Sequence, residues 1–146
     1  MSINISLLLL AISAVESGGN PLAVGKSGER SQFQITEAVW KIRSELQFTE
    51  ASKPDQIEAT RVAHEEMIAR ARQLEAAGVP ITPENLAYSW NAGARRAISH
   101  ALSGEKFKPN SYAQRVANGY ASALAEQPNK VPPYFRDVLP TLPKHL

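Results

Sequence analysis

The spacing of apolar residues along the chain predicts helices over most of its length. In the N-terminal segment, residues 4–17, Leu8, Ala11, Ile12 and Val15 recur at helical steps, and the other faces are largely apolar as well. A helix that is apolar on nearly every side belongs in the interior of a domain. We therefore predict that this segment is the buried helix around which the fold is built.

Further helical segments follow, separated by glycine and proline residues that end or exclude a helix. They are expected at residues 32–46, 55–77, 84–90, 94–102 and 111–125. The apolar positions expected to be buried in them include Phe33, Val39 or Trp40, Ile42, Ala63, Met67, Ala71, Leu74, Tyr112, Val116, Tyr120 and Leu124. The segment over residues 55–77 has the clearest amphipathic pattern, because charged residues cover the faces outside its apolar stripe.

Little in the pattern indicates strands. No run alternates clearly between apolar and polar residues, although the stretch between Leu22 and Ile35 has room for one short β-hairpin. Five of the ten prolines follow Gln127, so an irregular tail packed on the surface is expected from about residue 128. The sequence therefore predicts a mainly α fold, a single compact multi-helix domain over residues 1–146.

The composition narrows the chemistry. The 146 residues are 43% apolar and 21% charged, which suits one folded domain and not a disordered chain. There is no cysteine, so disulfides, thiol nucleophiles and thiolate metal sites are excluded. His64 and Glu65 begin like the zinc motif H-E-x-x-H, but position 68 is isoleucine. We expect no metal and no cofactor.

The net charge and the hydropathy of the chain indicate which kinds of partner it is expected to bind. The net charge of +2 suits an anionic polymer such as a cell wall, and the basic residues are spread along the chain apart from short clusters such as Arg95-Arg96. Without a concentrated basic face, we expect no nucleic-acid partner. The apolar segment from Ile3 to Val15 is too short to span a membrane comfortably, and no lysine or arginine precedes it as in a secretory signal.

Glu16 stands where the apolar N-terminal helix meets the turn S-G-G-N-P. A carboxylate there faces the negative end of the helix dipole, and apolar neighbours remove water from it. Both effects raise the pKa of a carboxyl group, which is what a general acid requires. A surface glutamate at a frayed helix end is the alternative, and the position alone leaves both open.

Other polar and aromatic residues are candidates for lining a cleft: Gln32, Gln34, Tyr88, Trp90, Asn91 and Tyr112. Amide side chains can hydrogen-bond sugar hydroxyl and N-acetyl groups, and aromatic faces stack on the C–H faces of sugars. A tyrosine hydroxyl can hold or polarise a neighbouring carboxyl group. Taken singly, the glutamines favour an ordinary polar helix start, and the tyrosines and the tryptophan are also compatible with core positions.

The motifs E-S-G-G-N-P, G-x-x-S-x-F-Q, A-Y-S-W-N-A-G and Y-x-x-R-V-x-x-x-Y follow one another between Leu8 and Tyr120. In this order they resemble the lytic transglycosylases of the soluble type, relatives of goose-type lysozyme. The resemblance implies a lysozyme-like domain in which Glu16 is the catalytic acid and base and Ser17 helps to orient it. Gln34 and Asn91 would line a glycan cleft, and Tyr112 would lie close to Glu16.

Two positions depart from the family pattern, and both fall in the expected cleft. Ser31 stands where the family usually has glycine, and Trp90 stands where it usually has tyrosine. These substitutions bear on substrate preference more than on the fold.

The activity implied by the resemblance is cleavage of the β-1,4 bond between N-acetylmuramic acid and N-acetylglucosamine in peptidoglycan, with a 1,6-anhydro end as product. The expected protein is a monomer acting on peptidoglycan strands in the periplasm, outside the cell or in a phage, and no export signal is visible in the sequence. A goose-type muramidase would instead hydrolyse the same bond and need a second carboxylate, for which Glu29 and Glu37 are candidates. A non-catalytic lysozyme-like module that only binds glycan is the remaining alternative.

Overall fold

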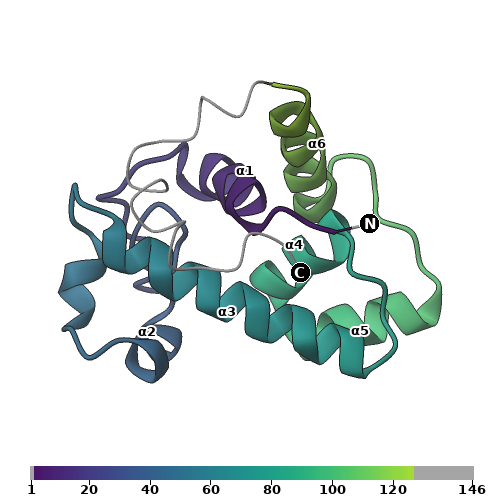
Figure 1. Cartoon of the computed structure of the whole chain (residues 1–146), viewed down its shortest axis with the longest axis horizontal. Coiled ribbons are helices and arrows are strands. Elements are labelled where there is room, and N and C mark those ends of the chain that lie inside the picture. Colours follow the sequence, from purple (N-terminus) through teal and green to yellow (C-terminus); the bar gives the residue numbers. More distant parts are fainter. Residues whose placement is uncertain (1, 127–146) are drawn as a thin grey trace.

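Helices dominate the computed structural model, which describes residues 2–126 (Figure 1). The elements in chain order are α1 (Ile5–Ser17), α2 (Glu37–Arg43), the short 3-10 helix η1 (Phe48–Ala51), α3 (Ile57–Ala76), α4 (Pro83–Ala92), α5 (Ala94–Ser103) and α6 (Tyr112–Ala125). The mainly α class predicted from the sequence is confirmed. The proline-rich tail expected from about residue 128 lies outside the described residues.

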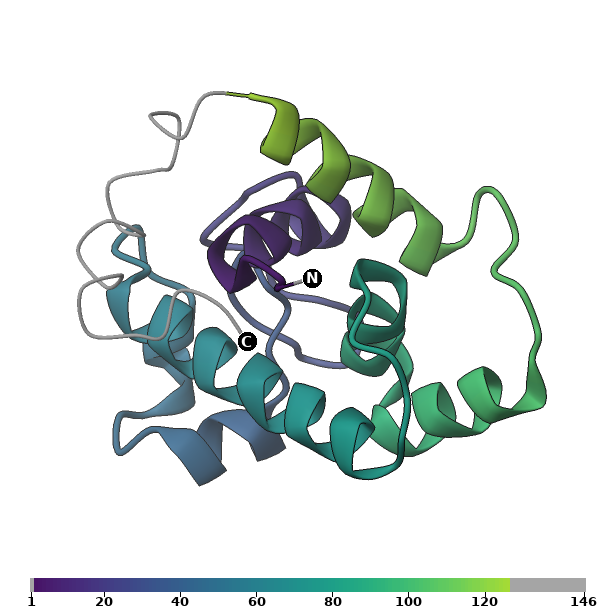
Figure 2. The same cartoon turned by 45° about the vertical axis from the view of Figure 1, so that its right-hand side comes forward.

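The first helix is the centre of the domain, as its apolar pattern predicts. Figure 2 shows α1 between α6 on one side and α3 on the other. Leu8, Leu9 and Ile12 are fully buried. At the start of α1, the Asn4 side chain accepts a hydrogen bond from the Leu7 backbone N–H (3.2 Å), which caps the helix.

One polar contact marks the start of α1 and one glycine ends it. The backbone N–H of Asn4 donates to the Tyr120 hydroxyl at 3.0 Å, which joins the start of α1 to the last turns of α6. Gly18 ends the helix at φ 63°, a left-handed conformation that glycine adopts without steric cost. Because α6 is fixed at Tyr120, its first residue, Tyr112, comes to lie at the opposite end of α1.

The third helix supplies the second wall of the core. The stripe predicted on it is confirmed, because Ala63, Met67, Ala71 and Leu74 are all buried. α3 packs against α1, α2, α4 and α5, and α4 in turn packs against α6 and α5. No helix in the described part of the chain combines the length and the apolarity needed to cross a membrane.

The helix expected over residues 32–46 is wrong in its first half. Ser31 and Gln34 have φ angles of 77° and 53°, which no right-handed helix contains. The chain therefore turns here, and α2 begins only after Thr36, whose hydroxyl accepts from the Val39 backbone N–H at 3.3 Å. The hairpin for which the sequence left room appears only as isolated antiparallel bridges, which pair Arg30 with Val24 and with Ile35.

Two apolar residues expected in the core are exposed. Ile42 is 77% exposed on α2, and Leu124 is 54% exposed near the end of α6. Helical spacing identifies which residues share a face, but it does not show how far along the helix a partner covers that face.

Ser31 combines a left-handed backbone with a buried side chain, so its variants test the local strain. Its hydroxyl accepts from the Phe33 backbone N–H at 3.0 Å. We expect Ser31→Ala to lower the free energy of unfolding by about 1 kcal/mol, because the bond is lost and the strain remains. Ser31→Gly loses the same bond but relieves strain of about 1 kcal/mol, so it should lie closer to wild type in urea denaturation. An alanine variant as stable as the glycine variant would contradict this interpretation.

Candidate functional site

Glu16 is the penultimate residue of α1, and its side chain is half-buried. Burial is the largest influence on its carboxyl group and raises the pKa above the ordinary value of 4.5. The hydroxyl of Tyr112 opposes that effect, the negative charge of Glu29 adds to it, and the positive charge of Arg115 opposes it. The outcome is a carboxyl group that holds its proton to a higher pH than an exposed glutamate.

Tyr112 reaches Glu16 from the first position of α6, where the Ser111 hydroxyl caps the helix by accepting from the Gln114 N–H at 3.3 Å. Its own hydroxyl is buried and makes no fully formed hydrogen bond, yet it lies close enough to interact with the Glu16 carboxyl. Burial, and then the negative charge of Glu16, raise the pKa of the Tyr112 hydroxyl. Tyr112 therefore remains a neutral donor directed at the carboxyl group.

Ser17 and Ser13 fasten the last turn of α1 to the turn that follows Ser31. The Ser17 hydroxyl donates to the Gln32 carbonyl at 2.8 Å and accepts from the Asn20 backbone N–H at 3.1 Å. The Ser13 hydroxyl donates to the Gln32 side-chain oxygen at 2.7 Å. These bonds hold the backbone on both sides of Glu16.

Gln32 itself is placed differently from the sequence expectation. Gln32 is only 1% exposed. Its backbone N–H donates to the Gln56 side-chain oxygen at 3.3 Å. It therefore supports the turn from within and does not reach a surface on which a sugar could lie.

The loop before this turn brings Glu29 and Gln34 together over Gly25. A Cβ atom on residue 25 would lie 1.9 Å from a Glu29 carboxylate oxygen and 2.4 Å from the Gln34 side-chain oxygen. A side chain on residue 25 would therefore have to displace the ends of the Glu29 and Gln34 side chains. The Gln34 amide nitrogen donates to the Ser31 carbonyl at 2.9 Å, which holds the amide in place. The sequence analysis did not identify this close approach to Gly25.

Of the two candidates for a second carboxylate, only Glu29 is coupled to Glu16. Its charge is one of the effects that raise the Glu16 pKa. Glu37 instead lies exposed on α2 and forms an ion pair with Lys41 at 3.2 Å.

The motif at the end of α4 is divided between two places. The Trp90 indole N–H donates to the Phe33 carbonyl at 3.1 Å, so this ring is tied to the same turn as Ser17. Asn91 follows it and is exposed. Tyr88 instead packs against the rings of His100 at 5.1 Å and Phe107 at 5.7 Å, between α4 and the segment after α5. These ring contacts place Tyr88 on the side of α4 that faces α5 and the segment after it.

The sequence analysis missed Arg70 of α3, because it placed the charges of this helix only on the faces outside the apolar stripe. Its guanidinium donates to the carbonyl groups of Ser89 and Trp90, the latter at 3.3 Å, and lies 5.4 Å from the Trp90 ring centre. It thereby neutralises the negative end of α4. Glu66 holds Arg70 at 3.1 Å and Arg43 at 2.6 Å. Burial opposes ionisation of Glu66, but these hydrogen bonds lower its pKa overall. The i, i+4 spacing of Glu66 and Arg70 was the available signal.

Neither a metal nor a homologous protein adds to this picture. Within residues 2–126, no group of three or more histidine or carboxylate side chains gathers where it could hold a metal ion. Comparison of the chain with protein-family models, curated proteins and solved structures finds no match. What the site does therefore has to be inferred from its geometry.

The effects that set the Glu16 pKa can be separated by substitution. Glu29→Gln removes a negative charge and should lower the Glu16 pKa, whereas Tyr112→Phe removes the stabilising hydroxyl and should raise it. Carbon-13 NMR titration of the Glu16 carboxyl measures both shifts, and Glu37→Gln serves as the matched control. If Glu37→Gln shifts the pKa as much as Glu29→Gln does, the assignment of Glu29 as the coupled carboxylate is wrong.

The raised pKa also predicts the pH dependence of stability. Because folded Glu16 binds its proton more tightly than unfolded Glu16, its contribution is fully present below pH 4.5 and is lost as pH rises through the folded pKa. Glu16→Gln cannot ionise, so its stability relative to wild type should increase from acidic to neutral pH. Urea denaturation at both pH values tests this, with Glu75→Gln on the exposed face of α3 as the control. A difference that is independent of pH would contradict the prediction.

Proposed function

We propose that this protein is a peptidoglycan-cleaving lytic transglycosylase, which breaks the β-1,4 bond between N-acetylmuramic acid and N-acetylglucosamine. The observation that carries the proposal is the half-buried Glu16 carboxyl, whose pKa is raised by burial and which lies beside the Tyr112 hydroxyl. The resemblance of the surrounding motifs to this family supplies the reaction and the substrate. That substrate would place the protein in the periplasm, outside the cell or in a phage.

The first step needs a proton donor. Protonated Glu16 would give its proton to the glycosidic oxygen as the bond to the anomeric carbon of N-acetylmuramic acid breaks. The positive charge that develops on that carbon would be met by the carbonyl oxygen of the substrate's own N-acetyl group, as in substrate-assisted glycosidases.

The second step needs a base, and the same residue serves. Ionised Glu16 would take the proton from the 6-hydroxyl of N-acetylmuramic acid, whose oxygen then bonds to the anomeric carbon and displaces the N-acetyl oxygen. The product is a 1,6-anhydro ring, water is not consumed, and Glu16 is protonated again.

The opposing effects on Glu16 suit a group that must act both as acid and as base. By raising the pKa, burial keeps the carboxyl group protonated to a higher pH, so that it can act as the proton donor. The Tyr112 hydroxyl and the charge of Arg115 stabilise the carboxylate once the proton has gone. A donor with no such support would give its proton less readily.

Substrate contacts are expected from Gln34, Trp90 and Asn91. Gln34 and Asn91 offer amides to sugar hydroxyl or N-acetyl groups, and Trp90 offers a half-buried ring that is fixed by its bond to Phe33. Gln32 is not among them, because it is buried.

One observation favours a second candidate, a muramidase that hydrolyses the same bond. Glu29 is coupled electrostatically to Glu16, and a hydrolase would use such a carboxylate to position water. A module that binds glycan without cutting it would have no use for a carboxyl group with a raised pKa, so we rank it third.

Product analysis tests the proposal directly. We expect the purified protein to release muropeptides with 1,6-anhydro ends from peptidoglycan, detected by mass spectrometry. Glu16→Gln should lower the rate by about 10²- to 10⁴-fold, because it removes the general acid. Glu75→Gln, an exposed glutamate on α3, should leave the rate unchanged.

Each other outcome has a defined meaning. Reducing ends, heavier than anhydro ends by one water, would assign the hydrolase. Binding of glycan without any cleavage, unaffected by Glu16→Gln, would assign the binding module and overturn the proposal.

A further inference from the structure

A hollow of about 760 Å³ lies on the face of the domain formed by α2 and the segments on either side of it. Its lining includes Gly28, Arg30, Trp40, Lys41, Glu45 and Phe48. Such a volume is within the range of small-molecule and peptide sites. Glu16 is not part of this lining, so the hollow is separate from the candidate catalytic carboxyl.

Arg30 provides a fixed positive charge at this hollow. Its guanidinium donates to the Ser52 hydroxyl at 2.8 Å and lies 5.6 Å from the centre of the Phe48 ring. These contacts orient the group without neutralising it, since no carboxylate within residues 2–126 forms an ion pair with it. A held guanidinium with free N–H groups is suited to bind a carboxylate.

The lining of the hollow also contains a negative charge, the carboxylate of Glu45. Glu45 is exposed at the hollow and has no ion-pair partner among the described residues, whereas Lys41 and Glu37 neutralise each other at 3.2 Å. The hollow therefore offers one unpaired cation and one unpaired anion. A ligand that carries both a carboxylate and an ammonium group would satisfy both.

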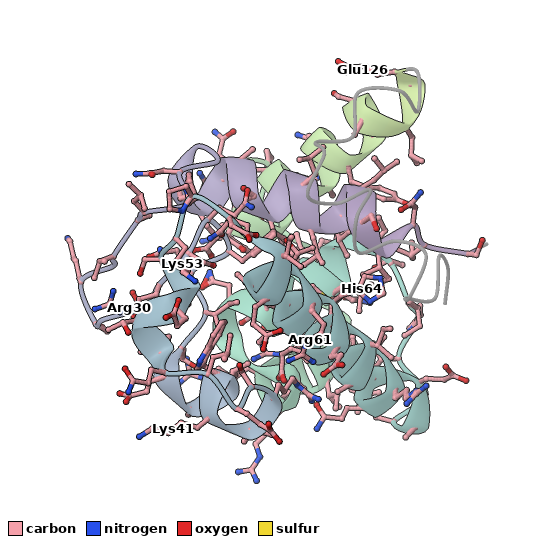
Figure 3. The ribbon with its side chains drawn as sticks, turned by 60° about the vertical axis from the view of Figure 1, so that its left-hand side comes forward. Arg30, Lys41, Lys53, Arg61, His64 and Glu126 are labelled. Atoms are coloured by element: carbon pink, nitrogen blue, oxygen red, sulfur yellow. The ribbon has the colours of Figure 1, made fainter. Side chains whose placement is uncertain are left out.

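One loop contributes neighbouring residues to the surroundings of Glu16 and to the hollow. Arg30 is in extended backbone, bridged to Val24 and Ile35, and successive side chains of an extended segment point to opposite sides. Glu29 accordingly acts on Glu16, while Arg30 borders the hollow. Figure 3 shows Arg30 and Lys41 together on the side that carries this loop and α2, away from His64 on α3.

We propose that this hollow binds a peptide that carries both a carboxylate and an ammonium group, as the stem peptides of peptidoglycan do. The proposal rests on the proposed function for its choice of peptide. It assigns Arg30 to the carboxylate and Glu45 to the ammonium, so that a stem peptide would be held on one side of the loop while the glycan lies at Glu16 on the other.

The test uses the intact chain and the N-terminally acetylated tripeptide N-acetyl-L-alanyl-γ-D-glutamyl-L-lysine without any sugar, in which the lysine ε-ammonium is the only ammonium group. Nitrogen-15 NMR of the wild-type protein should show shifts at the Arg30 side chain, the Trp40 indole and the Phe48 backbone, and none at the Trp90 indole. Chitotetraose, a glycan without peptide, should not shift the residues of the hollow. Shifts there with chitotetraose, or none with the tripeptide, would overturn the proposal.

Variants then identify the contacts. Arg30→Gln should weaken tripeptide binding about tenfold or more, because a charge-assisted hydrogen bond is lost. Lys26→Gln, which removes an exposed positive charge from the same loop without touching the hollow, should not. Glu45→Gln should weaken binding of the tripeptide but not of its ε-acetylated form. If Arg30→Gln and Lys26→Gln weaken tripeptide binding equally, only nonspecific attraction by positive charge remains, and the proposed site is wrong.

The outcome is independent of catalysis. Glu16→Gln protein should bind the tripeptide as wild type does. A protein that binds the tripeptide and releases no anhydro product would refute the proposed function and leave the peptide site standing. A protein that releases anhydro product and ignores the tripeptide would refute only the peptide site.

Discussion

The structure depends on one constraint: the most apolar helix of the domain must be largely buried and still carry a carboxylate in its last turn. Burying α1 between α3 and α6 removes water from Glu16, and that loss of solvation is the largest effect on its pKa. The bond from Asn4 to Tyr120 fixes α6 at the start of α1, and Tyr112 consequently lies at the end of α1 beside Glu16. Packing of the core and the chemistry of the site thus have the same origin.

The polar contacts around Glu16 are structural devices that serve the site indirectly. Ser17 and Ser13 tie the end of α1 to Gln32, and Trp90 ties the end of α4 to Phe33. Both ties converge on the turn that begins at Ser31, where the backbone is left-handed at two residues other than glycine. A strained turn held from several sides is a common feature of functional sites, because the surrounding contacts keep the backbone in a conformation that it would otherwise leave.

Sequence patterns predicted what depends on local periodicity. The buried α1 and the stripe on α3 followed from apolar spacing, because both helices are long enough for the pattern to be unambiguous. The break before α2 could not be predicted, since Ser31 and Gln34 adopt positive φ angles that their residue types do not announce. Gln32 is a polar residue whose burial depends on partners on α1 and before α3, and Arg70 acts on the distant end of α4. These roles depend on tertiary contacts with distant segments, which local sequence patterns do not indicate.

Glu16 holds its proton to a higher pH than an exposed glutamate, and we propose that it donates this proton during the reaction. The most direct test compares the NMR titration of Glu16 in the wild-type protein with the pH dependence of kcat/KM on solubilised glycan strands. The loss of kcat/KM toward alkaline pH should follow the Glu16 pKa, and that pKa should lie above 4.5, because kcat/KM reports the free enzyme. A Glu16 pKa at or below 4.5, or an alkaline limb that does not coincide with it, would contradict the claim.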